Sequence, residues 1–227
     1  MTDLVKRFSW LSVYAIAMAF LEAVVVAYIR ELLHLSHRAE LDSYALMEAW
    51  REAATIIMLV AVGWLTGRGK IDRLAYGMYA FALWDIWYYV WLKVLVDWPK
   101  TLLDWDTLFL IPFPWLGPVL APVLIAVLIC VVSVLTVYQV NRQEMPKINS
   151  LQGSVVLFGA LLALYVFMAG AIHEWIRGGE NWRSTQPGFF NWPVFLVAFL
   201  MMAIPSLMAI WPTKKKEENC PSPEKIS

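Results

Sequence analysis

Six long apolar stretches constrain this chain more than any other feature of its sequence. In lipid, backbone N–H and C=O groups find no water, so a segment that crosses a bilayer satisfies them internally, most simply as a helix of ~20 residues. Uninterrupted apolar runs of about that length predict an all-α fold, a polytopic bundle of about six transmembrane helices. The expected spans are residues 9–29, 46–66, 74–96, 116–138, 154–176 and 190–211.

The composition is that of a membrane protein. Hydrophobic residues make up 60% of the 227 positions and charged residues only 16%, whereas soluble domains carry about 25% charged residues. The 13 Trp are also typical, because Trp gathers at membrane–water interfaces. The cysteines, Cys130 and Cys220, are too few for a disulfide framework and are expected to be free. The net charge is zero, so we expect no nucleic-acid partner; the partners to consider are membrane lipids and another membrane protein.

The first stretch follows Lys6 and Arg7, as the apolar core of a signal peptide would. Such a core is only ~7–15 residues long, and this stretch is longer, so we expect a retained helix. Residues 1–212 are then a single transmembrane domain. The polar segment 213–227 is expected to be a disordered cytoplasmic tail.

Lysine and arginine are spread unevenly over the two sides that these spans define. Basic residues are enriched in cytoplasmic loops, and an internal N-terminus places eleven of them inside and six outside. This favours a location in the cell (inner) membrane with both termini cytoplasmic. The inner residues are Lys6, Arg7, Arg68, Lys70, Arg73, Arg142, Lys147, Lys214, Lys215, Lys216 and Lys225; the outer ones are Arg30, Arg38, Lys93, Lys100, Arg177 and Arg183.

Six charged residues interrupt the apolar spans. A charged side chain at the bilayer centre costs about 2.5–3.5 kcal/mol on insertion scales, so an ionisable residue there is a functional-site hypothesis by default. With the N-terminus inside, all six lie between the middle of the membrane and its outer surface. They are Glu22, Glu48, Arg51, Glu52, Asp85 and Lys93.

The spacing on the second span places its charges on one face. Glu48 and Glu52 are four residues apart, Arg51 lies beside Glu48, and Thr55 extends the same face inward. A plainer alternative is that Glu48, Arg51 and Glu52 form the solvated start of this helix. Another is that a charge pair with Arg51 only fixes the packing of the helices.

On the third span, Asp85, Tyr88, Tyr89 and Lys93 follow one side at spacings of three and four. The alternative for Lys93 is that its long side chain reaches the outer interface.

The first span carries alanines at every fourth position, a pattern that lets neighbouring helices approach closely. Glu22 borders this stripe, so we expect its carboxylate to face protein rather than lipid. The stripe consists of Ala15, Ala19, Ala23 and Ala27.

Residues 97–118 are too apolar for a plain loop and too broken by prolines for a span. We expect a short amphipathic or partly re-entrant element over the outer mouth of the charged cluster, or else an interfacial helix that only anchors the bundle. Pro118 and Pro122 are expected in the first turns of the fourth helix, where a missing N–H is tolerated. The polar loop 178–191 could cover the same mouth, and His173 and Glu174 could join it.

These residues suggest an outer-facing carboxylate and arginine pocket. Our leading hypothesis is a membrane-embedded enzyme acting on a lipid-linked or anionic substrate. Crowded carboxylates in low dielectric are either partly protonated or bind a cation, so a divalent ion such as Mg²⁺, Ca²⁺ or Mn²⁺ is one option for a cofactor. The alternatives are a small proton- or ion-coupled transporter and a non-catalytic subunit of a membrane complex. The candidate catalytic residues are Glu22, Glu52 and Asp85; the candidate substrate-binding residues are Arg51, Glu48, Tyr88, Tyr89 and Lys93.

Overall fold

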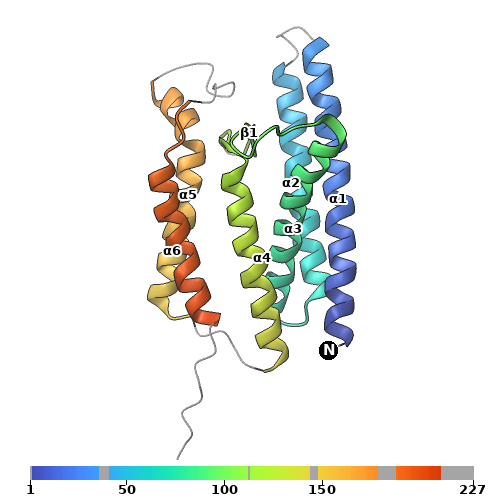
Figure 1. The fold of residues 1–227 in the computed structure, drawn as a ribbon, viewed down its shortest axis with the longest axis vertical. Coiled ribbons are helices and arrows are strands. Elements are labelled where there is room, and N and C mark those ends of the chain that lie inside the picture. Colours follow the sequence, from blue (N-terminus) through green and yellow to red (C-terminus); the bar gives the residue numbers. More distant parts are fainter. Residues whose placement is uncertain (1, 36–40, 112, 144–147, 178–187, 211–227) are drawn as a thin grey trace, which may run out of the picture.

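The computed structural model describes residues 2–35, 41–111, 113–143, 148–177 and 188–210, without the side chains of residues 2, 30–35 and 41–46. The predicted tail 213–227 and most of the loop 178–191 lie outside the described residues. Within them the fold is six helices and one small hairpin (Figure 1). The elements are α1 (Thr2–Leu35), α2 (Leu41–Thr66), α3 (Lys70–Val96), β1 (Trp105–Thr107), β2 (Leu116–Pro118), α4 (Leu120–Asn141), α5 (Ser150–Ile176) and α6 (Trp192–Ile210).

The predicted all-α membrane bundle is confirmed. Five of the helices contain a segment long and apolar enough to cross a membrane, namely Asp3–Ile29, Met47–Thr66, Leu120–Asn141, Ser150–Ile176 and Trp192–Ile210. The predicted third span, α3, forms a helix of 27 residues but is not among the five. Its Trp and Tyr side chains and Asp85 make it less apolar than the others, and it packs against α1, α2 and α4.

The alanine stripe of α1 is buried as expected. Ala15, Ala19 and Ala23 are each fully inaccessible to solvent. With no side chain beyond Cβ, they allow α1 to lie close to α3, whose Tyr76 and Ala80 belong to the same core.

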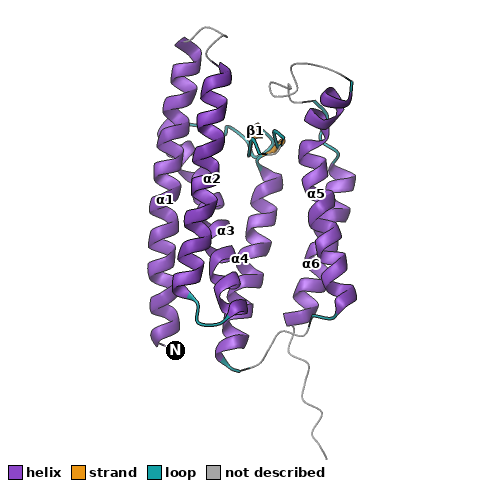
Figure 2. Cartoon of the chain, turned by 180° about the vertical axis from the view of Figure 1, so that it is seen from behind, coloured by secondary structure: helices purple, strands orange, loops and turns teal. Residues whose placement is uncertain are grey.

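The last two helices form a hairpin of their own, which lies beside α4 (Figure 2). α5 and α6 cross at Gly159, where an added Cβ would lie 2.8 Å from the Ala198 carbonyl oxygen. The α5–α6 pair contacts the rest of the protein through α6 against α4 and through α5 against β2. Residues packed around Phe190 and Phe195 fill this second core.

The segment 97–118 differs from its predicted form. β1 and β2 pair as antiparallel strands with Asp106 opposite Gly117, and the described part of the segment contains no helix. The alternative of an interfacial helix is therefore wrong for the described part of this segment. α4 begins at Leu120 rather than at residue 116, so Pro118 ends a strand and only Pro122 lies in the first helical turn.

The chain starts and α6 ends at the same end of the bundle, opposite to the β1–β2 hairpin (Figure 1). The placement of both termini on the cytoplasmic side stays a prediction.

Candidate functional site

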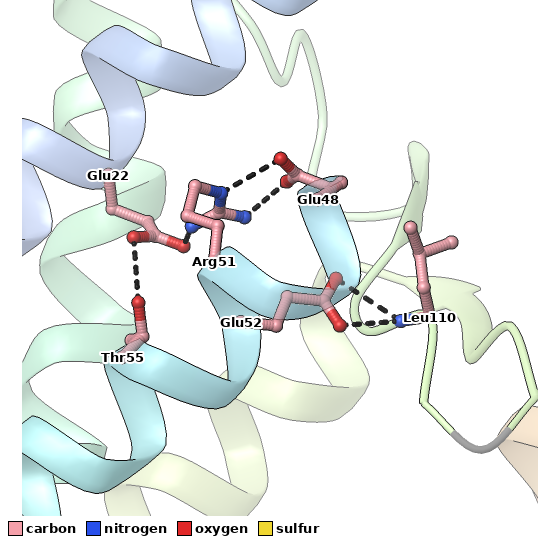
Figure 3. A network of polar contacts seen from close by, with 6 residues as sticks. All are labelled: Glu22, Glu48, Arg51, Glu52, Thr55 and Leu110. Carbon is pink, nitrogen blue, oxygen red and sulfur yellow. Dashed lines mark hydrogen bonds and ion pairs between the residues drawn. The ribbon is translucent and has the colours of Figure 1, made fainter. Parts of the chain in front are cut away.

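Arg51 on α2 is the centre of a network of charged side chains (Figure 3). Its Nε donates to a carboxylate oxygen of Glu48 at 2.8 Å, and its Nη2 pairs with the other oxygen. Its Nη1 pairs with Glu22 of α1. The side chains of Arg51, Glu48 and Glu22 are 23%, 17% and 11% exposed. One cation is thus shared by two largely buried carboxylates.

Glu22 connects α1 to α2 through a second contact as well. The Thr55 hydroxyl, which is buried, donates to Glu22 Oε2 at 3.2 Å. The expectation that Glu22 faces protein is therefore correct, and so is the position of Thr55 on the charged face of α2.

Glu52 points the other way, toward the β1–β2 hairpin (Figure 3). It is 6% exposed, and both of its oxygens accept from the backbone N–H of Leu110, at 2.9 and 3.2 Å. Leu110 lies in the connection between the two strands. The segment 97–118 therefore does contact the charged cluster, as predicted, although as a hairpin.

A second acidic group lies where α3 meets β1. Asp85 is half-buried and lies within electrostatic range of Asp106 on β1 and of Cys130 on α4. The Asp106 carboxyl group is hydrogen-bonded to the Tyr89 hydroxyl, one turn along α3 from Asp85. Asp106 and Tyr89 are 8% and 6% exposed. In the described part of the chain, no lysine, arginine or histidine pairs with Asp85.

A five-residue segment joins the two groups. Residues 106–110 place Asp106 beside Asp85 and Tyr89, and four residues later the Leu110 N–H meets Glu52. Tyr88 also bridges them, because it contacts the Tyr89 ring and lies within electrostatic range of Arg51.

Lys93 is not part of this cluster. Its side chain is 48% exposed and pairs with Asp97 at 2.7 Å just beyond the end of α3. Lys100 also pairs with Asp97. The hydrogen bond from Lys100, and then that from Lys93, lower the pKa of Asp97 to about 2. The position of Lys93 fits the alternative in which its side chain reaches the interface.

Sequence reasoning missed Asp106 and Cys130 as neighbours of Asp85. Asp106 lies in the segment 97–118, which we expected over the outer mouth of the cluster. The sequence feature that could have indicated this is the run DWDTLFLIP, in which most neighbours of Asp106 are apolar and favour burial. Cys130 is a free cysteine, as predicted.

The site offers no evident metal centre. Among the described residues, no group of three or more His, Cys, Asp or Glu side chains could hold a metal ion. His173 and Glu174 line a separate cleft of about 320 Å³ that Phe167 of α5 and Trp105 of β1 also border. A divalent cation, one option for a cofactor, is thus supported by no such group in the described part of the chain.

Comparison with known proteins adds no assignment, because no protein-family model, curated protein or solved structure matches this chain. The arrangement of helices identifies a membrane protein, and any activity has to be argued from the residues of the cluster themselves.

Proposed function

We propose that this protein is a membrane-embedded enzyme that performs acid–base chemistry on a substrate reaching it from the lipid. The observation that carries the proposal is that Asp85 lies within electrostatic range of Asp106, whose carboxyl group is hydrogen-bonded to the Tyr89 hydroxyl. Two carboxyl groups close together in apolar surroundings resist ionising together, so one holds a proton that it can donate. A protonated carboxyl beside an ionised one provides a general acid and a general base in one place.

Glu52 is the second acid–base candidate. Its hydrogen bonds from Leu110 N–H orient the carboxylate next to the hairpin. We assign Glu22, Glu48 and Arg51 to holding the helices, because two carboxylates already neutralise the guanidinium. An anion would have to displace one of them to bind Arg51, which disfavours the anion-binding role predicted for it.

The substrate class follows from the position of the pair. Asp85 lies within a helix whose neighbours α1, α2 and α4 carry membrane-spanning segments. A reactant that dissolves in lipid, such as a lipid-linked ester or phosphoester, can approach such a site through the bilayer. The ionised carboxylate would take a proton from an attacking hydroxyl or water, and the protonated carboxyl group would give its proton to the departing oxygen.

The test is a comparison of membrane lipids from cells that express the protein or its Asp85→Asn and Asp106→Asn variants. We expect lipid species that change with the intact protein and return to the empty-vector level in both variants. Asp97→Asn is the matched control, because Asp97 is exposed and has a left-handed backbone that Asn also adopts. It should behave as the intact protein does.

Reconstituted liposomes with an enclosed pH-sensitive dye distinguish the enzyme from a carrier. A proton flux that Asp85→Asn removes, together with an unchanged lipid profile, would overturn the proposal in favour of a proton-coupled transporter. Unchanged lipids with no flux, in a protein that aggregates when purified alone, would favour a subunit of a larger complex.

A further inference from the structure

An apolar groove of about 550 Å³ lies between α2 and α3, toward the end where the two helices are joined by residues 67–69. Its volume is within the ~300–1,000 Å³ of typical ligand sites. Most of its lining is aliphatic or aromatic, and Lys70 and Arg73 are its only charged members. The lining residues used below are Leu59, Trp64, Lys70, Arg73, Leu74 and Gly77.

The groove faces outward from the bundle over a predicted span. Trp64 and Leu74 are 58% and 67% exposed, although both are apolar and Trp64 belongs to the membrane-spanning segment Met47–Thr66. In a bilayer such a surface is covered by lipid chains. Gly77 has no side chain, which leaves a depression in this surface; a Cβ at this position would meet nothing closer than 3.7 Å.

Arg73 is held in place at one end of this depression. Its guanidinium lies over the Trp64 ring at 4.1 Å, and its Nε donates to the Gly67 carbonyl at 3.2 Å. No carboxylate of the described residues pairs with Arg73 or Lys70. The nearby Asp72 is buried and accepts from the backbone N–H of Arg68, and it lines a different, polar cleft.

The first turn of α3 therefore presents two cations where the N-terminal end of a helix is itself positive. Asp72, the acidic residue of the same turn, lines the other cleft rather than this groove, so no carboxylate of the described residues lines the groove beside the two cations. An apolar channel at bilayer depth that ends in a fixed guanidinium and a lysine matches a lipid tail that ends in an anionic phosphate.

We infer that this groove binds an anionic phospholipid, with an acyl chain between α2 and α3 and the phosphate at Arg73 and Lys70. The proposed phosphate position at Arg73 lies twelve residues, or about 18 Å, along α3 from Asp85, so binding of the headgroup there is separable from acid–base chemistry at Asp85. Both basic residues belong to the predicted inner side of the membrane, where lysine and arginine are enriched.

The experiment is native mass spectrometry of the delipidated, full-length protein with phosphatidylglycerol or phosphatidylcholine of identical acyl chains. A basic residue near an anionic headgroup is worth about fivefold in affinity. We expect the intact protein to prefer phosphatidylglycerol, and Arg73→Gln and Lys70→Gln each to lower that preference about fivefold. Gly77→Leu, which fills the groove, should weaken retention of both lipids.

Arg142→Gln is the matched control. Arg142 lies at the same end of the bundle, after α4, and its guanidinium also stacks over a ring, that of Tyr138, at 4.5 Å. It does not line the groove, so its loss should leave the preference unchanged.

Equal retention of the two lipids by the intact protein would overturn the inference. So would an effect of Arg142→Gln as large as that of Arg73→Gln, because the preference would then reflect the charge of the whole surface. Lys70→Gln keeps the test decisive if Arg73→Gln fails to fold, because no other described side chain depends on Lys70. Asp85→Asn should bind phosphatidylglycerol as the intact protein does, even if the proposed enzyme activity is not found.

Discussion

The crossing of α2 and α3 allows one packing prediction to be developed from two glycines on facing helices. A Cβ added to Gly63 would lie 2.5 Å from the Cα of Gly77, 2.6 Å from its N and 2.9 Å from the Arg73 carbonyl oxygen. A Cβ added to Gly77 would meet only the Gly63 Cα at 3.7 Å and the Leu59 carbonyl oxygen at 3.8 Å. The crossing is therefore asymmetric, and only one of the two glycines is required.

The magnitudes follow from these distances. Carbon atoms make their best contact at about 3.5–4.0 Å, so Gly63→Ala has to separate the two backbones by about 1 Å. Overpacking of this kind costs about 1–3 kcal/mol. Replacing a helical glycine by alanine returns up to about 1 kcal/mol at either position. Because this gain is common to both variants, their difference in unfolding free energy isolates the packing cost of about 1–3 kcal/mol.

Reversible unfolding in mixed micelles of a mild detergent and dodecyl sulfate, followed by far-UV circular dichroism, measures this difference. We expect Gly63→Ala to be less stable than the intact protein and Gly77→Ala to be equally or more stable. Equal stability of the two variants would refute the asymmetric crossing. A loss confined to Gly77→Ala would mean that the two helices cross in a different register.

Three further results are expected. Glu22→Gln should lower the unfolding free energy by about 1–2 kcal/mol, less than the 3–5 kcal/mol of a fully buried ion pair, because Glu22 and Arg51 are both partly exposed. A double-mutant cycle with Arg51→Met in the same micelles should give a coupling energy above about 0.5 kcal/mol. Asp97 should titrate near pH 2 in carboxyl-carbon NMR, rather than at the ordinary Asp pKa of ~3.9. Its ion pairs therefore stabilise the fold at pH values above that ordinary pKa, and this stabilisation is lost as the pH falls through 2. Gly117→Ala should be destabilising by about 1–3 kcal/mol in the micelle assay, because its Cβ would lie 2.8 Å from the Phe167 ring.

Helix positions could be predicted from the sequence because lipid leaves the backbone few choices. An apolar run of ~20 residues in a bilayer has to be helical, and this condition does not depend on knowing any tertiary contact. The burial of Ala19 and the protein-facing position of Glu22 could be predicted for a similar reason. Both depend on the spacing of residues along one helix, which is a local property.

The hairpin could not be predicted on the same basis. Leu116–Pro118 is apolar and adjoins an apolar helix, so composition assigns it to that helix. Its strand conformation depends on pairing with Trp105–Thr107, a contact between segments that are separated in sequence. The same pairing brings Asp106 to Asp85, and for this reason the acidic pair was missed.

Lys93 illustrates a different failure. Lys93 does lie on the same side of α3 as Tyr89 and Asp85. However, its side chain is exposed, whereas Tyr89 is buried. Lys93 lies near the C-terminal end of α3, where Asp97 is four residues away and exposed. A long, flexible side chain near a helix end reaches for solvent and an exposed partner, and the i,i+4 pairing with Asp97 was the sequence feature that indicated this.

The charged residues of the bundle divide according to whether a cation accompanies them. Glu22 and Glu48 share Arg51, so their charges are satisfied in one arrangement, and moving a proton onto Glu22 would weaken the link between α1 and α2. A group that holds helices together is a poor choice for a proton donor, since each cycle would loosen the structure.

Asp85 has no cation as a partner among the described residues, and its neighbour Asp106 belongs to a hairpin rather than to a helix. Because Asp106 is four residues from Leu110, displacing the hairpin from Asp85 would also withdraw the N–H that orients Glu52. The two acid–base candidates therefore depend on one element, and Asp106→Asn is expected to affect both.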